Sequence, residues 1–365
     1  MVVGAGAAGA STAWWLARRG HRIALVDRFE AGHERGSSHG TERIFRMAYA
    51  DPTYVALAHE ALPLWRELEA DTGTHLLTTT GGLDTGFPDE LDAIAASCAT
   101  HGIETQLLAE AEARRRFPGL ALPGPALFQP DAGCTHADGA LAAMRDSAAQ
   151  RGAALHLEEA VVAIEPDPER ERVRVHTTGR TLEATTCVVA AGAWAAPLLA
   201  GIVALPEITV TTEQVGFFRP RSADTAWPTF VDREECSCYG LPTPAGLLKV
   251  GEHYTGEVVD PDTRGFDVHP AGWARLLAWV AEHVPGVEPT PVRHTTCLYA
   301  SSPDEDFVID RVGNIVVAAG LGGHGFKFAP VLGRHLADLA VGHDWPGNPF
   351  TLQREVLQVG PSGHK

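Results

Sequence analysis

The sequence predicts an α/β protein in which a Rossmann-type dinucleotide-binding domain carries an inserted, mixed-sheet substrate domain. A glycine-rich turn opens the chain, nucleotide-binding segments return in the middle and at the end, and longer alternating strands lie between them. We expect residues 1–80, 136–205 and 291–365 to form the nucleotide-binding domain. Residues 81–135 and 206–290 are expected to form the substrate domain.

The glycine-rich turn reads G-x-G-x-x-G at Gly4, Gly6 and Gly9, between the short strand "MVV" and the helix "ASTAWWLARRG". Gly4 permits the tight turn, Gly6 lets the backbone approach a pyrophosphate, and Gly9 lets the helix pack on the strand. The second strand, "HRIALVD", ends on Asp27, which can accept hydrogen bonds from ribose hydroxyls. Only three residues precede Gly4, so the first strand is short or the natural start lies upstream.

Three later segments are predicted to form helices. "DPTYVALAHEALPLWRELEADTG" and "PAGWARLLAWVAEHV" predict amphipathic helices, and "GFKFAPVLGRHLADLA" predicts the last helix. A buried strand leads to a tight turn at Gly192, which would again bring backbone N–H groups near a cofactor.

The composition excludes several partners. The net charge of −17 argues against nucleic acid and anionic membranes. No apolar run reaches the roughly 20 residues of a membrane span, no basic region precedes the apolar start, and "PSGHK" carries no targeting signal. Six irregularly spaced cysteines, with Cys236 and Cys238 lacking a second ligand pair, predict neither disulfides nor a metal site. We expect a reduced, cytoplasmic protein.

Five blocks together point to a family: "GAGAAG", "GSSHGTERIFR", "VVAAGAW", "CLYASSPDEDFVIDR" and "GLGGHGFKFAPVLG". In this order, over essentially the whole chain, they resemble the D-amino-acid-oxidase-like flavoproteins, and more closely the monomeric sarcosine oxidase and N-methyl amino acid oxidase branch. The resemblance implies FAD as cofactor, a GR2-like FAD-binding domain and a monomer. It also implies that Cys297 carries the flavin through a thioether to its 8-methyl group.

A cysteine attacks the flavin methyl group as a thiolate, which needs cations nearby. His39, Arg43 and Arg46 are candidates, and their spacing would let Arg43 and Arg46 share one face of a helical turn. The alternative is a solvated basic patch. The resemblance places Arg43 beside the flavin ring.

The resemblance also implies the substrate contacts. Arg46 and Lys327 would hold the substrate carboxylate, because arginine binds two oxygens and lysine adds a compact charge. Lys249, in the strand "GLLKVGEH", would assist the reaction with O2 near flavin N5. Its alternative is a structural salt bridge to Glu252 or another acid.

His253, Tyr239 and Tyr299 would frame the substrate, although each is also compatible with a core position. In "GLGGHGFKF", the residues that would approach the flavin are Gly322, Gly323, His324 and Gly325. The stretch "DREECSCYG", with three acids and two cysteines, suggests a larger or cationic substrate.

The predicted function is oxidation of a secondary amine, such as sarcosine or another N-methyl amino acid. Hydride would pass to flavin N5, O2 would reoxidise the flavin to give H2O2, and the imine would hydrolyse. One alternative is a cyclic imino acid oxidase acting on pipecolate or a piperideine carboxylate. Others are a dehydrogenase using an electron carrier, a non-catalytic flavin-binding protein, and an NAD-binding module.

Overall fold

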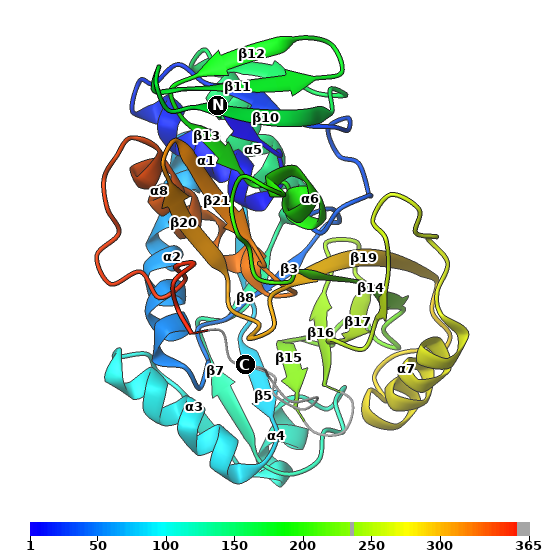
Figure 1. The fold of residues 1–365 in the computed structure, drawn as a ribbon. Helices are drawn as coiled ribbons and strands as arrows, with labels where there is room; N and C mark the ends of the chain where they lie inside the picture. Colours follow the sequence, from blue (N-terminus) through cyan, green and yellow to red (C-terminus); the bar gives the residue numbers. More distant parts are fainter. Residues whose placement is uncertain (234–236, 356–365) are drawn as a thin grey trace.

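The computed structural model describes residues 1–233 and 237–355 of the chain. Figure 1 shows two halves, each built around a sheet, with the chain passing between them several times. Cys236 and both glutamates of "DREECSCYG" lie outside the described residues.

The first half is a six-stranded sheet in the order β20-β21-β13-β1-β2-β9, parallel except for β20 at one edge. The predicted βαβ unit is confirmed, and β1 at its start spans only two residues. The strands are β1 (Val2–Val3), β2 (Ala24–Val26), β9 (Ala154–His156), β13 (Cys187–Val189), β20 (Val308–Val312) and β21 (Ile315–Ala319).

Both faces of this sheet are buried, as a parallel sheet requires. Successive residues of β1, β13 and β21 point to opposite faces and enter different cores. The helices on one face are α1 (Ala7–Arg18), α5 (Ala137–Gln150) and α8 (Ala329–Ala340). The other face is covered by α6 (Ala195–Leu199), β10 (Val161–Asp167) and β11 (Arg172–Thr177), and β12 (Thr181–Ala184) pairs with β11.

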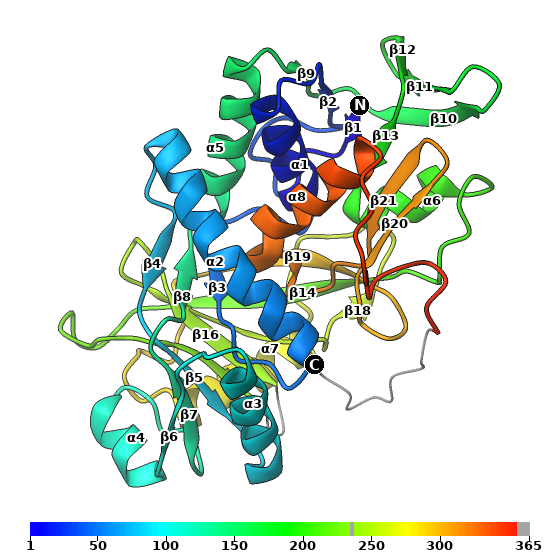
Figure 2. The ribbon, with the colours of Figure 1, turned by 90° about the vertical axis from the view of Figure 1, so that its left-hand side faces the viewer.

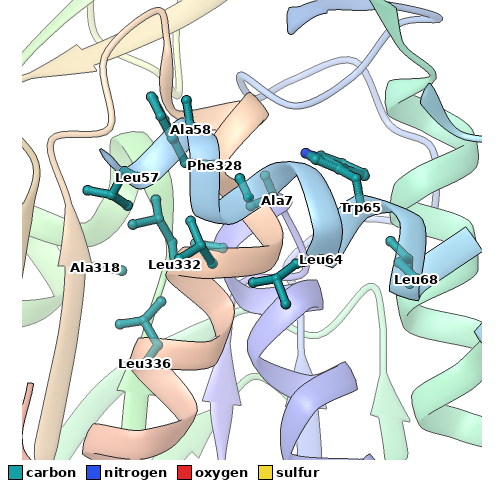
Figure 3. Close-up of a cluster of buried hydrophobic side chains, with 14 of the residues drawn as sticks. Ala7, Leu57, Ala58, Leu64, Trp65, Leu68, Ala318, Phe328, Leu332 and Leu336 are labelled. Carbon is teal, nitrogen blue, oxygen red and sulfur yellow. The ribbon is translucent and has the colours of Figure 1, made fainter. Parts of the chain in front are cut away.

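Helix α2 (Pro52–Thr72) packs across α8 and connects the core to the site between the halves. The Asp51 carboxylate caps its first turn, and Gly73, at φ 68°, ends it. Figure 3 shows Leu64 of α2 near Leu332 of α8, within one hydrophobic cluster. The Trp65 indole donates a hydrogen bond to the Lys327 carbonyl at 2.8 Å, so the core fixes the backbone of a predicted site residue.

The second half is a nine-stranded mixed sheet, and Figure 2 shows it from the side, below the first half. Its path runs β18-β14-β17-β16-β15-β5-β7-β6, and β19 also pairs with β14. The strands are β5 (Gly82–Thr85), β6 (Gln106–Leu108), β7 (Ala126–Gln129), β14 (Thr209–Phe218), β15 (Thr229–Asp232), β16 (Cys238–Pro242), β17 (Leu248–Glu252), β18 (Glu257–Val258) and β19 (Arg293–Ser301). Three further helices belong to this half: α3 (Pro88–Thr100), α4 (Glu110–Arg116) and α7 (Pro270–His283).

Strand β19 lies in this second sheet, although its residues belong to the segment 291–365 expected in the nucleotide-binding domain. Its nine consecutive pairings with β14 place it there. The two halves therefore share this segment of the chain.

A small sheet joins the halves through β3 (Arg43–Phe45), β8 (Gly133–Thr135) and β4 (Leu77–Thr79). The expected helical turn around Arg43 and Arg46 is wrong, because β3 pairs with β8 as an extended strand. Arg46 follows directly after this strand. The two arginines make different contacts, because Arg43 donates to backbone carbonyls and Arg46 to the Asp84 carboxylate.

Among the described residues, no helix has the length and hydropathy to cross a membrane. That part of the chain also contains no group of three or more His, Cys, Asp or Glu residues able to hold a metal ion.

The close crossing of α1 and α8 depends on Gly333. A Cβ atom there would lie 2.1 Å from Ser11 Oγ, so Gly333→Ala should lower the free energy of unfolding by about 1–3 kcal/mol. Gly265→Ala is the control, because its Cβ would meet nothing within 4 Å. Chemical denaturation of both variants measures the effect, and equal stability of the two would contradict this account.

Candidate active site

A cavity of about 1340 Å³ runs between the two halves. It is larger than the roughly 300–1,000 Å³ of a typical small-molecule pocket, so it has room for a dinucleotide and a substrate. Every predicted site residue except Gly9 lines it: Gly4, Gly6, Asp27, His39, Arg43, Arg46, Gly192, Tyr239, Lys249, His253, Cys297, Tyr299, Gly322, Gly323, His324, Gly325 and Lys327.

The glycine-rich turn has the packing that its sequence predicts. Gly4 adopts φ +97°, and a Cβ atom there would lie 2.3 Å from the Ala190 carbonyl oxygen. A Cβ atom on Gly9 would lie 1.8 Å from the Gly4 carbonyl oxygen, so Gly9 serves the contact between helix and strand and not the cavity wall. Gly6 faces the cavity, where its nearest neighbour would be Ser38 Oγ at 3.1 Å.

Asp27 lies beside the glycine-rich turn. Its carboxylate accepts hydrogen bonds from the Ala5 N–H at 2.6 Å and from the Phe29 N–H at 2.9 Å. A carboxylate has about four acceptor positions, so both oxygens can still accept hydrogen bonds from ribose hydroxyls.

A loop from the second half closes over the same end of the cavity, which the sequence did not indicate. The Asp262 carboxylate accepts hydrogen bonds from Arg28 and from the Trp194 indole. The Arg264 guanidinium donates to the carbonyls of Glu34 and Arg35 at 3.1 and 3.2 Å. These contacts join segments that are far apart in the sequence, so the fold alone brings them to the cavity.

The large sheet directs its reactive side chains to the cavity by simple alternation. Cys297 and Tyr299 are two apart on β19, so they share one face. Lys249 on β17 and Tyr239 on β16 also line the cavity. The opposite face packs on α7 through the hydrophobic cluster that includes Leu248.

Of the three cations expected near Cys297, only Arg43 influences its thiol, together with Lys249. Burial raises the pKa of its thiol, and the charges of Arg43 and Lys249 oppose that rise. Burial, with Arg43 adding to it, lowers the pKa of His39 to about 3, so this histidine is neutral near pH 7. His39 is therefore uncharged, and Arg46 pairs with the Asp84 carboxylate, so the expectation that these two residues supply the charge is wrong.

Arg43 is held by backbone carbonyls. Its guanidinium donates to the carbonyl oxygens of Glu42 at 2.8 Å, Ser37 at 2.8 Å and His39 at 2.6 Å. None of these three acceptors carries a net charge, so the positive charge of Arg43 remains available at the cavity wall.

Lys249 pairs with Glu42, which the sequence did not identify. Its Nζ lies 3.8 Å from the Glu42 carboxylate and 3.4 Å from the Glu42 carbonyl oxygen. Glu252, the first alternative partner, instead binds Arg275 at 2.7 Å. Burial lowers the pKa of Lys249 to about 8, with Arg43 contributing to the decrease and Glu42 opposing it.

Three aromatic residues form a connected group in the cavity wall. His253 Nδ1 lies 3.1 Å from the Tyr299 hydroxyl, and the rings of His253 and Tyr239 meet edge to face. Burial raises the pKa of both tyrosines, so their hydroxyls stay protonated and can donate hydrogen bonds. Tyr254, at φ 57°, packs edge to face against Tyr299.

Arg46 and Lys327, the pair predicted to bind the substrate carboxylate, both approach the Tyr49 ring, at 4.1 and 5.6 Å from its centre. The Lys327 ammonium donates to the His324 carbonyl at 2.9 Å. Burial lowers the pKa of Lys327 well below its usual value, and the charge of Arg46 lowers it further. Arg46 stacks on Tyr49 with its guanidinium carbon 4.1 Å from the ring centre, and it contacts the Asp84 carboxylate at 3.2 Å.

The late glycines bring the turn η2 (Gly325–Phe328) against the aromatic group. A Cβ atom on Gly323 would lie 2.2 Å from the Tyr299 ring, and one on Gly325 would lie 2.8 Å from Leu321 Cβ. Their absent side chains therefore serve packing within the protein. Burial lowers the pKa of His324 well below its usual value, so this histidine is neutral.

The comparison with known families fits this geometry. The family model described as FAD dependent oxidoreductase (DAO) matches residues 1–339. The chain belongs to this family. It is an FAD-dependent amino acid oxidoreductase with the fold that the sequence predicts.

Several relatives in the family act on amino acids. The chain is 36% identical to human peroxisomal sarcosine oxidase, over 93% of this chain and 91% of the human protein. It is 34% identical to monomeric sarcosine oxidase from a Bacillus species, over 93% and 91%. A solved structure of a Tyr258Phe mutant of NikD, an unusual amino acid oxidase essential for nikkomycin biosynthesis, has a TM-score of 0.85 at 30% identity, with 94% of both chains covered.

The cavity fits FAD on its own geometry. Gly6 and Gly192 open toward it, and a Cβ atom on Gly192 would meet nothing within 4 Å. His39 lines the cavity, and within the described part of the chain its buried Nε2 has no hydrogen-bond partner, so a polar ligand would satisfy it.

Removing the acid at the nucleotide end should weaken retention of the cofactor. Asp27→Ala loses the acceptor for ribose hydroxyls and the support of the Ala5 N–H, so the purified variant should contain several-fold less flavin per protein than the wild type. The flavin absorbance divided by the amount of protein gives this ratio. Glu165→Gln, an exposed carboxylate on β10, is the control, and unchanged flavin content in Asp27→Ala would contradict the role.

Proposed function

We propose that the enzyme oxidises the C–N bond of a secondary amino acid, with sarcosine or another N-methyl amino acid as the first candidate. The observation that carries this proposal is one continuous cavity joining a dinucleotide cradle to two buried cations, Arg46 and Lys327. The sarcosine oxidases named above, each more than 30% identical, support this choice of substrate class.

In this proposal Arg46 and Lys327 bind the substrate carboxylate. Their charges also disfavour a protonated amine nearby, so the amine is held in the neutral form that reacts. The Tyr239 and Tyr299 hydroxyls and His253 orient the substrate and exclude water. Bound FAD supplies the acceptor for the hydride, and O2 then takes the electrons to give H2O2. Lys249 places a positive charge where oxygen is reduced.

A ring-containing substrate is the second candidate. The aromatic walls of Tyr239, Tyr299 and His253 suit a flat or cyclic imino acid such as pipecolate. In either case we propose a cytoplasmic monomer.

An oxygen electrode with a peroxide assay tests the oxidase reaction. Sarcosine, N-methyl-L-alanine and L-pipecolate are the substrates, and we expect one H2O2 for each O2 consumed with at least one of them. Reduction of an artificial dye without oxygen consumption would instead identify a dehydrogenase.

We propose that Cys297 would form a thioether with the flavin 8-methyl group. The new C–S bond would replace a methyl C–H bond, and O2 would take up the two electrons left on the flavin. Arg43 and Lys249 both favour its thiolate, which is the attacking form. In Cys297→Ser the flavin should stay in the supernatant after acid precipitation, whereas the wild-type pellet should remain yellow. Cys187→Ser, at a buried thiol outside the cavity, should keep a yellow pellet. A colourless wild-type pellet would contradict the covalent link.

The oxygen reaction should depend on the charge of Lys249. Because its pKa is about 8, the ammonium is present below that pH and is lost above it. The second-order rate constant for oxygen with the reduced enzyme should therefore fall as the pH rises through about 8, whereas Lys249→Met should be slow at all pH values. Stopped-flow mixing of the reduced enzyme with oxygen measures this rate constant.

The control for this prediction is Arg170→Met, which removes a cation whose side chain is 79% exposed and which does not line the cavity. That variant should keep both the wild-type rate and its pH dependence. A Lys249→Met enzyme that reacts with oxygen as fast as the wild type would show that another group supplies the charge.

A further inference from the structure

A buried carboxylate lies beside the proposed carboxylate-binding pair. Asp84 is 3% exposed, and its Oδ1 lies 3.2 Å from Arg46 Nη1. A substrate carboxylate that reaches Arg46 therefore approaches a second negative charge in a region with little water. Two such anions repel each other strongly, so Asp84 alone would weaken substrate binding.

Arg233 contacts the same carboxylate oxygen. Its Nη2 and Nε lie 3.3 and 3.4 Å from Asp84 Oδ1, and its side chain is 7% exposed. Arg46 and Arg233 therefore lie within two hydrogen-bond lengths of each other and share one negative charge.

The three side chains of Arg46, Arg233 and Asp84 differ in whether they line the cavity. Arg46 and Arg233 both line the cavity, whereas Asp84 does not, so both arginines are nearer to a bound substrate than the carboxylate that they share. The charges of Arg46, Arg233 and Asp84 all act on the pKa of Tyr49, which burial raises to about 12, so the three form one electrostatic group.

A second carboxylate fixes Arg233 from the other side. Glu90, in the first turn of α3, accepts a hydrogen bond from Arg233 Nη1 at 3.2 Å. The neighbouring Gly86 leaves space for this pair, because a Cβ atom there would lie 3.1 Å from both Arg233 Cβ and Glu90 Oε2. Arg233 is thus held between two carboxylates. Glu90 also lines the cavity, but its side chain is 30% exposed, so solvent screens its charge more than that of Asp84.

We propose that Arg233 is a positioning residue that offsets the charge of Asp84 and leaves Arg46 with a net positive charge for the substrate carboxylate. This inference rests on the proposed function, in which Arg46 binds that carboxylate. It gives "DREECSCYG" a role other than recognition of a cationic substrate, since the side chain of this stretch that meets Asp84 is itself a cation.

The test uses the flavin-containing enzyme and furan-2-carboxylate, a ring carboxylate without an amine. Its dissociation constant is measured from the change in the flavin absorption spectrum. Arg233→Met should raise this constant about tenfold to a hundredfold, the size expected when a charged contact is lost. The double variant Asp84→Asn/Arg233→Met should return it to within about threefold of the wild type, because the uncompensated anion is gone.

Two controls separate this role from a structural one. Arg221→Met removes an exposed arginine that pairs with Glu288 and should leave the constant unchanged. In Arg233→Met the flavin should still be reduced at the wild-type limiting rate at saturating substrate, with the loss confined to KM.

Wild-type affinity in Arg233→Met, or a double variant as weak as the single one, would overturn the proposal. If Arg233→Met does not fold, Asp84→Asn decides: binding at least as tight as the wild type supports the proposal, and weaker binding overturns it. Arg46→Met separates failure of this inference from failure of the proposed function, because unchanged affinity in that variant would reject the carboxylate site itself.

Discussion

The candidate active site depends on burying cations beside a cavity without cancelling their charge. Most of these cations donate hydrogen bonds to backbone carbonyl oxygens. These carbonyls accept hydrogen bonds from Arg43, from Lys249 through the Glu42 carbonyl, and from Lys327 through the His324 carbonyl. A carbonyl dipole compensates part of the lost hydration and carries no net charge, so each cation still attracts an anion. The lowered pKa values of Lys249 and Lys327 show that the compensation is incomplete.

The fold holds these carbonyls by ordinary packing. The indole of Trp65, from the core between α2 and α8, donates to the Lys327 carbonyl and fixes the turn that carries it. Strand β3 is fixed by pairing with β8, and it sets the position of Arg43. Carboxylates do approach two of the cations, since Glu42 lies near Lys249 and Asp84 near Arg46. There the sum of the neighbouring charges determines how strongly the cation attracts an anion.

The nucleotide-binding half follows from the sequence because its determinants are local. Gly4, Gly9 and Asp27 act within one βαβ unit, and alternation along a single strand places Cys297 and Tyr299 together. The contacts that the sequence did not reveal join distant segments. Lys249 and Glu42 are 207 residues apart, and Arg233 and Asp84 are 149 apart. The prediction of a helical turn around Arg43 was wrong for the same reason, since its strand is specified by pairing with β8, a distant part of the chain.

In the proposed reaction the buried cations hold a secondary amino acid against bound FAD so that the flavin is reduced. Anaerobic stopped-flow mixing with sarcosine and L-pipecolate tests it most directly. We expect the visible flavin band to bleach completely with at least one of them, at a rate that saturates with concentration. If neither these nor other secondary amino acids bleach the flavin, while furan-2-carboxylate still binds, the carboxylate site would be real and the proposed reaction wrong.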